Sequence, residues 1–228
     1  MRLLAKIGSQ PKLVKGDGVT GYLFGGLHLA PHKLSGHNTC PFASKGCAHV
    51  CLNKVGYGRY SKIQAARIKK TKLFYSDRKL FLSLLYKDLH SLCIRALSLG
   101  LRPACRLNLT SDIAWERVAP QLFSDFPMIQ FYDYTKNAAR CMTSYRLPAN
   151  YSLVFSRSES NNRGMRKVLR SGKCNVVIVF HRIPKTYLGR KVVNGDKNDA
   201  RFLEGKGNIV GVRGKGLRAK FDKTGFVV

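Results

Sequence analysis

The segment Ser35-Gly36-His37-Asn38-Thr39-Cys40-Pro41-Phe42-Ala43-Ser44-Lys45-Gly46-Cys47-Ala48-His49-Val50-Cys51 carries three cysteines with the spacing C-x6-C-x3-C. Glycine, serine, asparagine and proline surround the cysteines, so this backbone can turn tightly around a small bound group. Cys47 and Cys51 are one helical turn apart, which places them on the same side of a helix. Three thiols gathered in this way indicate a metal-binding site.

Three interpretations of these cysteines are open. In the first interpretation, the three cysteines are buried thiols, because free cysteine is a common small core residue. In the second they bind a structural zinc, whose usual four protein ligands would include His37 or His49. In the third they hold a [4Fe–4S] cluster and leave one iron position open. The polar surroundings and the tight spacing favour a metal over plain burial.

The composition is that of an intracellular globular protein. Its 228 residues are enough for one large domain or, at a stretch, two small ones. The 44% of hydrophobic residues can form a core and argue against global disorder. We find no run of about 18–20 apolar residues for a membrane span, and the apolar start is too short for a signal peptide. Seven cysteines, three of them clustered, suit a reducing compartment better than disulfides. We therefore expect a cytoplasmic protein without a membrane partner.

The charge points to a polyanionic partner. Lysine and arginine number 41 against 12 aspartate and glutamate, which gives a net charge of +29. These excess positive charges repel one another in the folded state unless a polyanion binds to the surface. Solvated helix faces would normally carry acidic residues in comparable number. Nucleic acid is the partner that this balance predicts, through contacts to phosphates, and DNA and RNA are equally open.

The pattern along the chain predicts an α/β fold with mostly parallel strands. A first strand at 21–30 leads into the cysteine loop, and helices follow at about 60–74 and 77–97, the second capped by Asp77. Further strands are expected at 104–109, 128–134, 151–155, 174–180 and 208–212, with helices at 112–123, 137–142 and 162–169 and a polar insertion at 184–207. Short right-handed connections between six parallel strands predict a partial (β/α)6 barrel with the cysteine loop after the first strand.

The sequence pattern predicts three parts of the chain. Residues 1–20 are a basic, loose lead-in, and residues 217–228 are a basic tail with a flexible composition. Residues 21–216 form a single α/β partial-barrel domain, in which 33–58 is the metal-binding loop.

Polar or charged residues follow each predicted strand, where the functional site of a parallel α/β barrel lies. No catalytic residue can be assigned from them, and ordinary loop polarity or helix capping is the alternative, most clearly for Asp112 as an N-cap. The candidates for substrate or cofactor binding are Arg106, Asn108, Ser111, Asp112, Lys136, Arg157, Glu159, Arg213 and Lys215.

Aromatic residues accompany basic residues near the cysteine loop. Tyr57, Tyr60, Phe74 and Tyr75 are placed as base-stacking surfaces would be. Packing in the core is the alternative.

Several motifs resemble the phage gene-product-eighty-eight family over roughly residues 20–216. They include His28-Leu29-Ala30-Pro31, Cys40-Pro41-Phe42-Ala43-Ser44, Arg106-Leu107-Asn108, Phe131-Tyr132-Asp133-Tyr134-Thr135-Lys136 and Phe155-Ser156-Arg157-Ser158. The resemblance implies a phage origin, and hence the cytoplasm of the infected host cell.

A more distant resemblance is to radical S-adenosylmethionine enzymes, which also place three cysteines after the first strand of a six-unit partial barrel. It implies that Cys40, Cys47 and Cys51 hold a [4Fe–4S] cluster with one open iron, with S-adenosylmethionine as a further cofactor. The spacing differs from that family's C-x3-C-x2-C, and Thr110-Ser111-Asp112 stands where the family has Gly-Gly-Glu.

The expected function is therefore that of a phage-type iron–sulfur protein that binds or acts on nucleic acid, by radical chemistry if it is an enzyme. One alternative is a non-catalytic nucleic-acid-binding protein with a structural zinc or cluster. Another is a phage factor that binds a host protein with an acidic surface.

Overall fold

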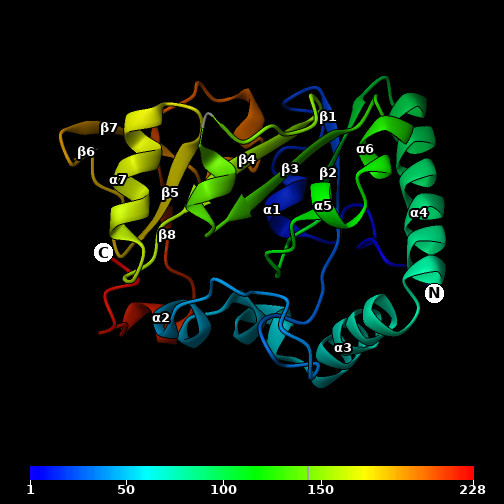
Figure 1. The fold of residues 1–228 in the computed structure, drawn as a ribbon, viewed down its shortest axis with the longest axis horizontal. Helices are drawn as coiled ribbons and strands as arrows, with labels where there is room; N and C mark the ends of the chain where they lie inside the picture. The colour runs from blue at the N-terminus through cyan, green and yellow to red at the C-terminus, as the bar shows by residue number, and fades with distance from the viewer. Residues whose placement is uncertain (143) are drawn as a thin grey trace. The chain divides into compact units, whose positions relative to one another are not determined.

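The computed structural model describes residues 1–142 and 144–228 and is a mixed α/β structure (Figure 1). Its strands form an eight-stranded, mostly parallel sheet in the order β1-β2-β3-β4-β5-β8-β7-β6. The strands are β1 (Tyr22–Gly26), β2 (Arg102–Arg106), β3 (Gln130–Thr135), β4 (Tyr151–Ser156), β5 (Asn175–Phe180), β6 (Thr186–Tyr187), β7 (Arg190–Asn194) and β8 (Ile209–Arg213). Pairs β1–β2, β2–β3, β4–β5, β5–β8 and β7–β8 are parallel, and β6–β7 is antiparallel.

Helices occupy most of the connections between the strands. The α-helices are α1 (Pro11–Val14), α2 (Lys45–His49), α3 (Ser61–Ser76), α4 (Arg78–Ser98), α5 (Trp115–Val118), α6 (Gln121–Asp125), α7 (Asn162–Ser171) and α8 (Leu217–Lys220). Short 3-10 helices are η1 (Leu52–Lys54), η2 (Gly56–Arg59), η3 (Ala138–Cys141) and η4 (Arg201–Leu203).

The predicted α/β class and the parallel strand direction are confirmed, while closure into a partial barrel stays a prediction. Each of the six predicted strands overlaps an observed one. The prediction of a polar insertion at 184–207 missed the hairpin of β6 and β7. That hairpin is short and mostly exposed, so it lacks the alternation of apolar residues that reveals a strand in a sequence.

The chain divides into two compact units, which are described separately. Unit 1 comprises Met1–Pro41, Tyr60–Asp133 and Leu147–Ser152. Unit 2 comprises Phe42–Arg59, Tyr134–Arg146 and Leu153–Val228. The predicted limits of a single domain at 21 and 216 stay a prediction.

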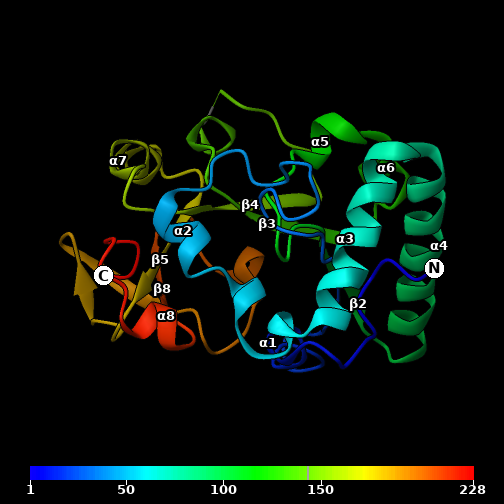
Figure 2. The same cartoon turned by 90° about the horizontal axis from the view of Figure 1, so that it is seen from below.

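In unit 1, α4 packs against β1 and β2 and lies beside α3 (Figure 2). The Asp77 carboxylate accepts a hydrogen bond from the Leu80 N–H at 2.9 Å, which confirms the predicted cap. Leu80 and Leu99 are exposed. The buried face instead consists of Phe81, Leu85, Leu89, Leu92, Cys93 and Ala96, which recur at helical spacing.

The single helix predicted at 112–123 is wrong. Two short helices, α5 and α6, stand there, and Pro120 separates them because proline has no N–H to continue the first helix. Ala114 is the N-cap residue of α5 and makes no side-chain cap, so Asp112 does not have the capping position predicted for it.

In unit 2, α7 packs against β5 through Met165, Val168 and Leu169. Gly172 follows the helix with φ 68°, a left-handed conformation that glycine adopts without strain. The predicted helix at 162–169 is thus present and ends two residues later than predicted.

Both basic end segments are anchored rather than loose. In unit 1, Leu3 and Leu4 are buried, and their N–H groups donate to the Asp88 carboxylate at 2.6 and 2.8 Å. In unit 2, Phe226 and Val227 are buried, and the Val228 N–H donates to the Val179 carbonyl at 2.9 Å. The few apolar residues within these basic segments account for their anchoring.

Within the part of the chain that the structure describes, no helix has the length and apolar character needed to cross a bilayer.

We predict that Phe226→Ala destabilises the protein, whereas Phe221→Ala leaves the stability almost unchanged. Phe226 is 6% exposed, so its removal should lower the free energy of unfolding by about 3 kcal/mol. Phe221 is 66% exposed and serves as the matched control. Chemical denaturation followed by circular dichroism measures both, and equal stabilities of the two variants would contradict the anchoring of this segment.

Candidate functional site

Cys40 in unit 1 is held by a tight local turn. Its N–H donates to the Asn38 side-chain oxygen at 3.0 Å, and its sulfur accepts the His32 N–H at 3.3 Å. His32 adopts a left-handed φ of 52°, a conformation that non-glycine residues seldom take. The Cys40 sulfur also lies 3.7 Å from the Thr110 carbonyl oxygen. The sulfur is therefore aimed at the chain that follows β2.

Thr110 connects this sulfur to His28, which is half-buried. The Thr110 hydroxyl lies 3.3 Å from His28 Nδ1, and Gln10 Oε1 lies 3.1 Å from His28 Nε2. Burial, followed by the positive charges of Arg67, Arg106 and Lys70, lowers the pKa of His28 to about 3. His28 is therefore neutral at physiological pH.

The cations around His28 come from two elements. Arg67 and Lys70 lie on α3, and Arg106 ends β2. Arg67 and Arg106 are buried, and burial is also the main cause that lowers the pKa of Lys70. Positive charges in a medium of low dielectric attract an anion strongly. This part of unit 1 can therefore stabilise a carboxylate, a phosphate or a metal-bound thiolate.

Arg106 is thus one predicted site residue, and its charge acts on His28. Sequence reasoning missed its companions His28, Arg67 and Lys70. The available signal was a pair of cations, Arg67 and Lys70, at helical spacing among the apolar residues of α3.

Asn108 and Ser111 lie in a buried hydrogen-bond network. The Asn108 N–H and side-chain amide donate to the Asp133 carboxylate at 2.7 and 3.0 Å. Its side-chain oxygen accepts the Ser111 hydroxyl at 2.7 Å and the Ile113 N–H at 3.0 Å. Tyr151 also donates to Asp133, at 2.8 Å. These contacts use the polar atoms of Asn108 internally and favour a structural role, while ligand binding by Asn108 and Ser111 stays a prediction.

Asp112 lies on the same chain segment. Its N–H donates to the Thr39 carbonyl at 2.8 Å, next to Cys40. This bond joins the loop after β2 to the cysteine turn.

Cys47 lies in α2, whose start is fixed by Glu159 in unit 2. The Glu159 carboxylate accepts the Ser44 hydroxyl and the Gly46 N–H, both at 2.8 Å. Ser44 in turn accepts the Cys47 N–H at 3.1 Å as the N-cap. A Cβ at Gly46 would lie 2.3 Å from the Thr224 hydroxyl oxygen, so this close approach requires glycine. Glu159, predicted to bind a ligand, therefore positions the helix of Cys47.

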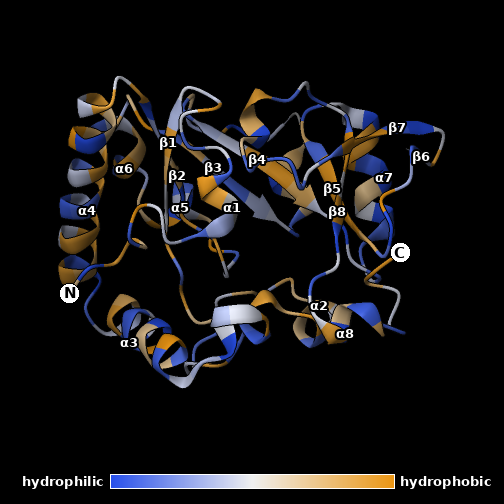
Figure 3. Ribbon diagram, turned by 180° about the vertical axis from the view of Figure 1, so that it is seen from behind, coloured by the Kyte–Doolittle hydropathy of each residue, from blue (hydrophilic) through white to orange (hydrophobic). Residues whose placement is uncertain are grey.

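Cys47 packs against an apolar cluster made by the C-terminal residues. The cluster contains Val50, Ala219, Phe226 and Val227. Helices α2 and α8 accordingly lie side by side in Figure 3. Cys51 follows α2 and is the N-cap residue of η1.

Lys136 and Arg157 reach the same C-terminal residues. Arg157 donates from Nη1 to the carbonyls of Gly225 and Phe226, and from Nε to Asn162 Oδ1 at 3.0 Å. Lys136 donates to the Ser156 hydroxyl at 2.7 Å and lies 5.3 Å from the centre of the Phe226 ring. Three predicted site residues, Lys136, Arg157 and Glu159, thus gather in unit 2.

Arg213 and Lys215 are not part of that group. Their side chains are exposed, and the Arg213 backbone N–H donates to Asp196 Oδ2 at 3.0 Å. They belong to the basic surface.

The aromatic residues behave in two ways. Phe74 is buried and makes edge contacts with Phe81 and Trp115, so the core interpretation is right for Phe74. Tyr57 and Tyr60 are exposed, and Tyr75 stacks on His37 with ring centres 4.1 Å apart. For these three tyrosines, base stacking stays a prediction.

The three cysteine sulfurs are donors that suit a soft metal. None of the seven cysteines forms a disulfide, so Cys40, Cys47 and Cys51 keep their thiol groups. Over residues 1–142 and 144–228, no three His, Cys, Asp or Glu side chains are grouped as metal ligands. Metal binding by the three cysteines stays a prediction.

The pKa of His28 predicts a pH dependence of stability. Because the folded-state pKa of about 3 is below the ordinary 6.5, the unfolded chain binds the proton between these values. The free energy of unfolding should therefore fall as the pH drops from 6.5, by up to about 1.4 kcal/mol per pH unit. His28→Gln should remove this part of the slope, and His181→Gln at an exposed position should not. Urea denaturation at several pH values measures it, and identical slopes would contradict the burial of a neutral His28.

The comparisons with known proteins give one match. The family model described as Gene product 88 matches residues 2–228. No curated protein and no solved structure matches the chain. Because the match spans nearly the whole sequence, the chain belongs to the Gene product 88 family of phage proteins.

Proposed function

We propose that this protein is a phage iron–sulfur protein that binds nucleic acid through its basic surface. Cys40, Cys47 and Cys51 hold a [4Fe–4S] cluster in this proposal. The observation that supports it best is that the Cys40 sulfur and His28 both lie beside Thr110, and that the charges of Arg67, Arg106 and Lys70 act on His28.

The surroundings of Cys40 suit a thiolate ligand. Thiolates, not thiols, bind metals, and nearby positive charge favours the thiolate form. Arg67, Lys70 and Arg106 supply that charge around His28. The His32 N–H directed at the sulfur is the kind of hydrogen bond that tunes iron–sulfur centres. When bound, a cluster of this type supplies one-electron transfer.

The same cations provide a place for an anionic group of a substrate or cofactor. A guanidinium presents several N–H donors in a plane and binds carboxylates and phosphates with two bonds. Arg106 and Arg67 are both buried, so such a contact would be little screened by solvent. A phosphate of nucleic acid or the carboxylate of S-adenosylmethionine has the matching charge.

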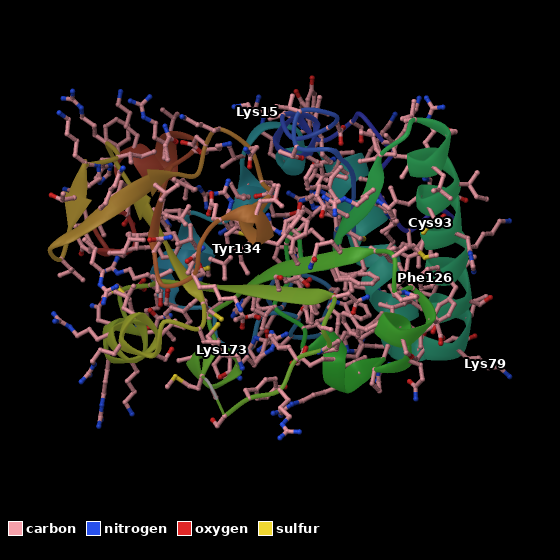
Figure 4. The ribbon with its side chains drawn as sticks, turned by 90° about the horizontal axis from the view of Figure 1, so that it is seen from above. Lys15, Lys79, Cys93, Phe126, Tyr134 and Lys173 are labelled. Atoms are coloured by element: carbon pink, nitrogen blue, oxygen red, sulfur yellow. The ribbon has the colours of Figure 1, made fainter. Side chains whose placement is uncertain are left out.

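The outer surface of the helices supports contact with a polyanion. Helix α7 exposes Arg163, Arg166, Lys167 and Arg170, and α3 exposes Lys62, Lys69 and Lys72. Neither helix contains an acidic residue. The ion pairs between basic and acidic side chains that normally stabilise a charged helix face therefore cannot form within either helix. Figure 4 illustrates the pattern, with Lys79 pointing away from α4. Phosphates would offset this repulsion.

A radical reaction that uses S-adenosylmethionine is the second candidate. The three clustered cysteines and the cations around His28 favour it. In this role Arg106 would hold the carboxylate of the cofactor, and the exposed cations would hold the nucleic acid.

We predict that protein purified without air is brown and carries about four irons and four sulfides per chain. Cys47→Ala should abolish the iron, whereas Cys93→Ala, in the core of unit 1, should keep it. Iron and sulfide analysis gives the result, and adding S-adenosylmethionine and a reductant to the same sample tests for 5′-deoxyadenosine.

Each outcome of that analysis has a defined meaning. Release of 5′-deoxyadenosine supports the second candidate, and no release under any reductant rejects it. If the analysis finds one zinc and no iron per chain, the cysteines form a structural zinc site and hold no cluster. Iron that Cys47→Ala leaves unchanged contradicts the proposed ligands.

We also predict that affinity for nucleic acid falls steeply with salt. Replacing Arg166 and Arg170 with alanine should reduce the slope of log affinity against log salt by about 0.9 per lost contact to duplex phosphate. Lys87→Ala on α4, next to Asp88, is the matched control and should have a smaller effect. Fluorescence anisotropy measures the series.

A flat salt response would contradict binding through phosphates. Capture of one acidic host protein that nuclease does not release, together with that flat response, would favour the host-factor alternative.

A further inference from the structure

The β6–β7 hairpin of unit 2 has a residue at its tip that the turn itself does not favour. Pairs Thr186–Lys191 and Tyr187–Arg190 leave a loop of two residues, Leu188 and Gly189. Both have left-handed φ values, 50° and 71°, which define the turn type that strongly prefers Asn-Gly. Leucine is an unfavourable choice at this position because its side chain crowds the backbone.

Leu188 gains no burial that would compensate for this conformation, since its side chain is 46% exposed. Backbone strain that folding does not explain is a pointer to function. An exposed aliphatic side chain at the tip of a projecting hairpin is suited to contact an apolar surface of a partner.

The sides of the hairpin indicate what kind of partner this is. Arg182, Lys185, Arg190 and Lys191 are exposed around the tip, and residues 181–195 contain no acidic residue. In Figure 3 the outer end of β7 is coloured as hydrophilic. The hairpin therefore presents an apolar tip between cations. Nucleic acid has the complementary pattern, with apolar base surfaces between two rows of phosphates.

The base of the hairpin is rigid enough to direct the tip. Tyr187 makes an edge contact with Phe180, with ring centres 5.3 Å apart. Val192 is buried and donates its N–H to the Lys185 carbonyl at 2.9 Å. A Cβ at Gly211 would lie 2.7 Å from Ile183 and 2.8 Å from Val192, so glycine lets the hairpin pack closely on β8. The hairpin projects beyond β5 and β8 in Figures 1 and 3.

We propose that the β6–β7 hairpin is an arm that enters the minor groove of double-stranded DNA and inserts Leu188 between base pairs. This inference rests on the proposed binding of nucleic acid and specifies double-stranded DNA as the nucleic acid that is bound. Proteins that bend DNA from the minor groove insert aliphatic side chains between base steps and hold the flanking phosphates with cations. Single strands are instead held by aromatic stacking, for which an aliphatic tip is poorly suited.

Leu188→Asn tests the arm without loss of the fold, because asparagine tolerates the left-handed conformation. Its thermal unfolding midpoint should equal or exceed that of the wild type. The probe is a duplex of about 30 base pairs with a fluorescent pair at its ends, which reports the bend while anisotropy reports the affinity. Leu203→Asn, at a residue 52% exposed in η4, is the matched control.

The wild type and Leu203→Asn should bend the duplex by about 20–90°, and Leu188→Asn should not. The affinity of Leu188→Asn should fall less than about tenfold, because the cations remain. A duplex that is bound but not bent, or that Leu188→Asn bends equally, overturns the arm and leaves nucleic-acid binding intact. Binding to single strands alone also overturns it. Failure to bind any nucleic acid removes both proposals.

Discussion

The neutral imidazole of His28 is the constraint around which the candidate site in unit 1 is arranged. Its pKa is held far below the ordinary value by burial and by three neighbouring cations. An uncharged ring can occupy a place where a further positive charge would be repelled, and it still bonds to Thr110 and Gln10. The site therefore concentrates positive charge around His28 and remains compatible with a folded core.

Positive charge of this kind serves a protein whose partners are anions. Metal-bound thiolates, phosphates and carboxylates all gain from it, and each is costly to bury without a countercharge. The proposed cluster, the proposed contact of Arg106 with an anionic group and the proposed contact with nucleic acid thus share one physical requirement.

In unit 2 the cysteine segment depends on a different device. Glu159 binds the start of α2, and Gly46 allows Thr224 and Phe226 to approach its backbone closely. Arg157 holds the carbonyls of the same C-terminal residues. Residues far apart in the sequence therefore fix the position of Cys47. Two of them, Arg157 and Glu159, had looked like ligand-binding residues because they follow a predicted strand.

The sequence by itself determined the α/β class, the parallel strand direction, most helix positions and the strongly basic character. These features depend on local periodicity, on capping residues such as Asp77 and Gly172, and on composition. It also offered Arg106 and the three clustered cysteines as candidate site residues, and their roles stay predictions. Only the tertiary structure placed His28, Arg67 and Lys70 together, enclosed Asn108 in a network with Asp133, and anchored Phe226. Such contacts join residues from separate elements, and their strength comes from burial, which no pattern of neighbouring residues encodes.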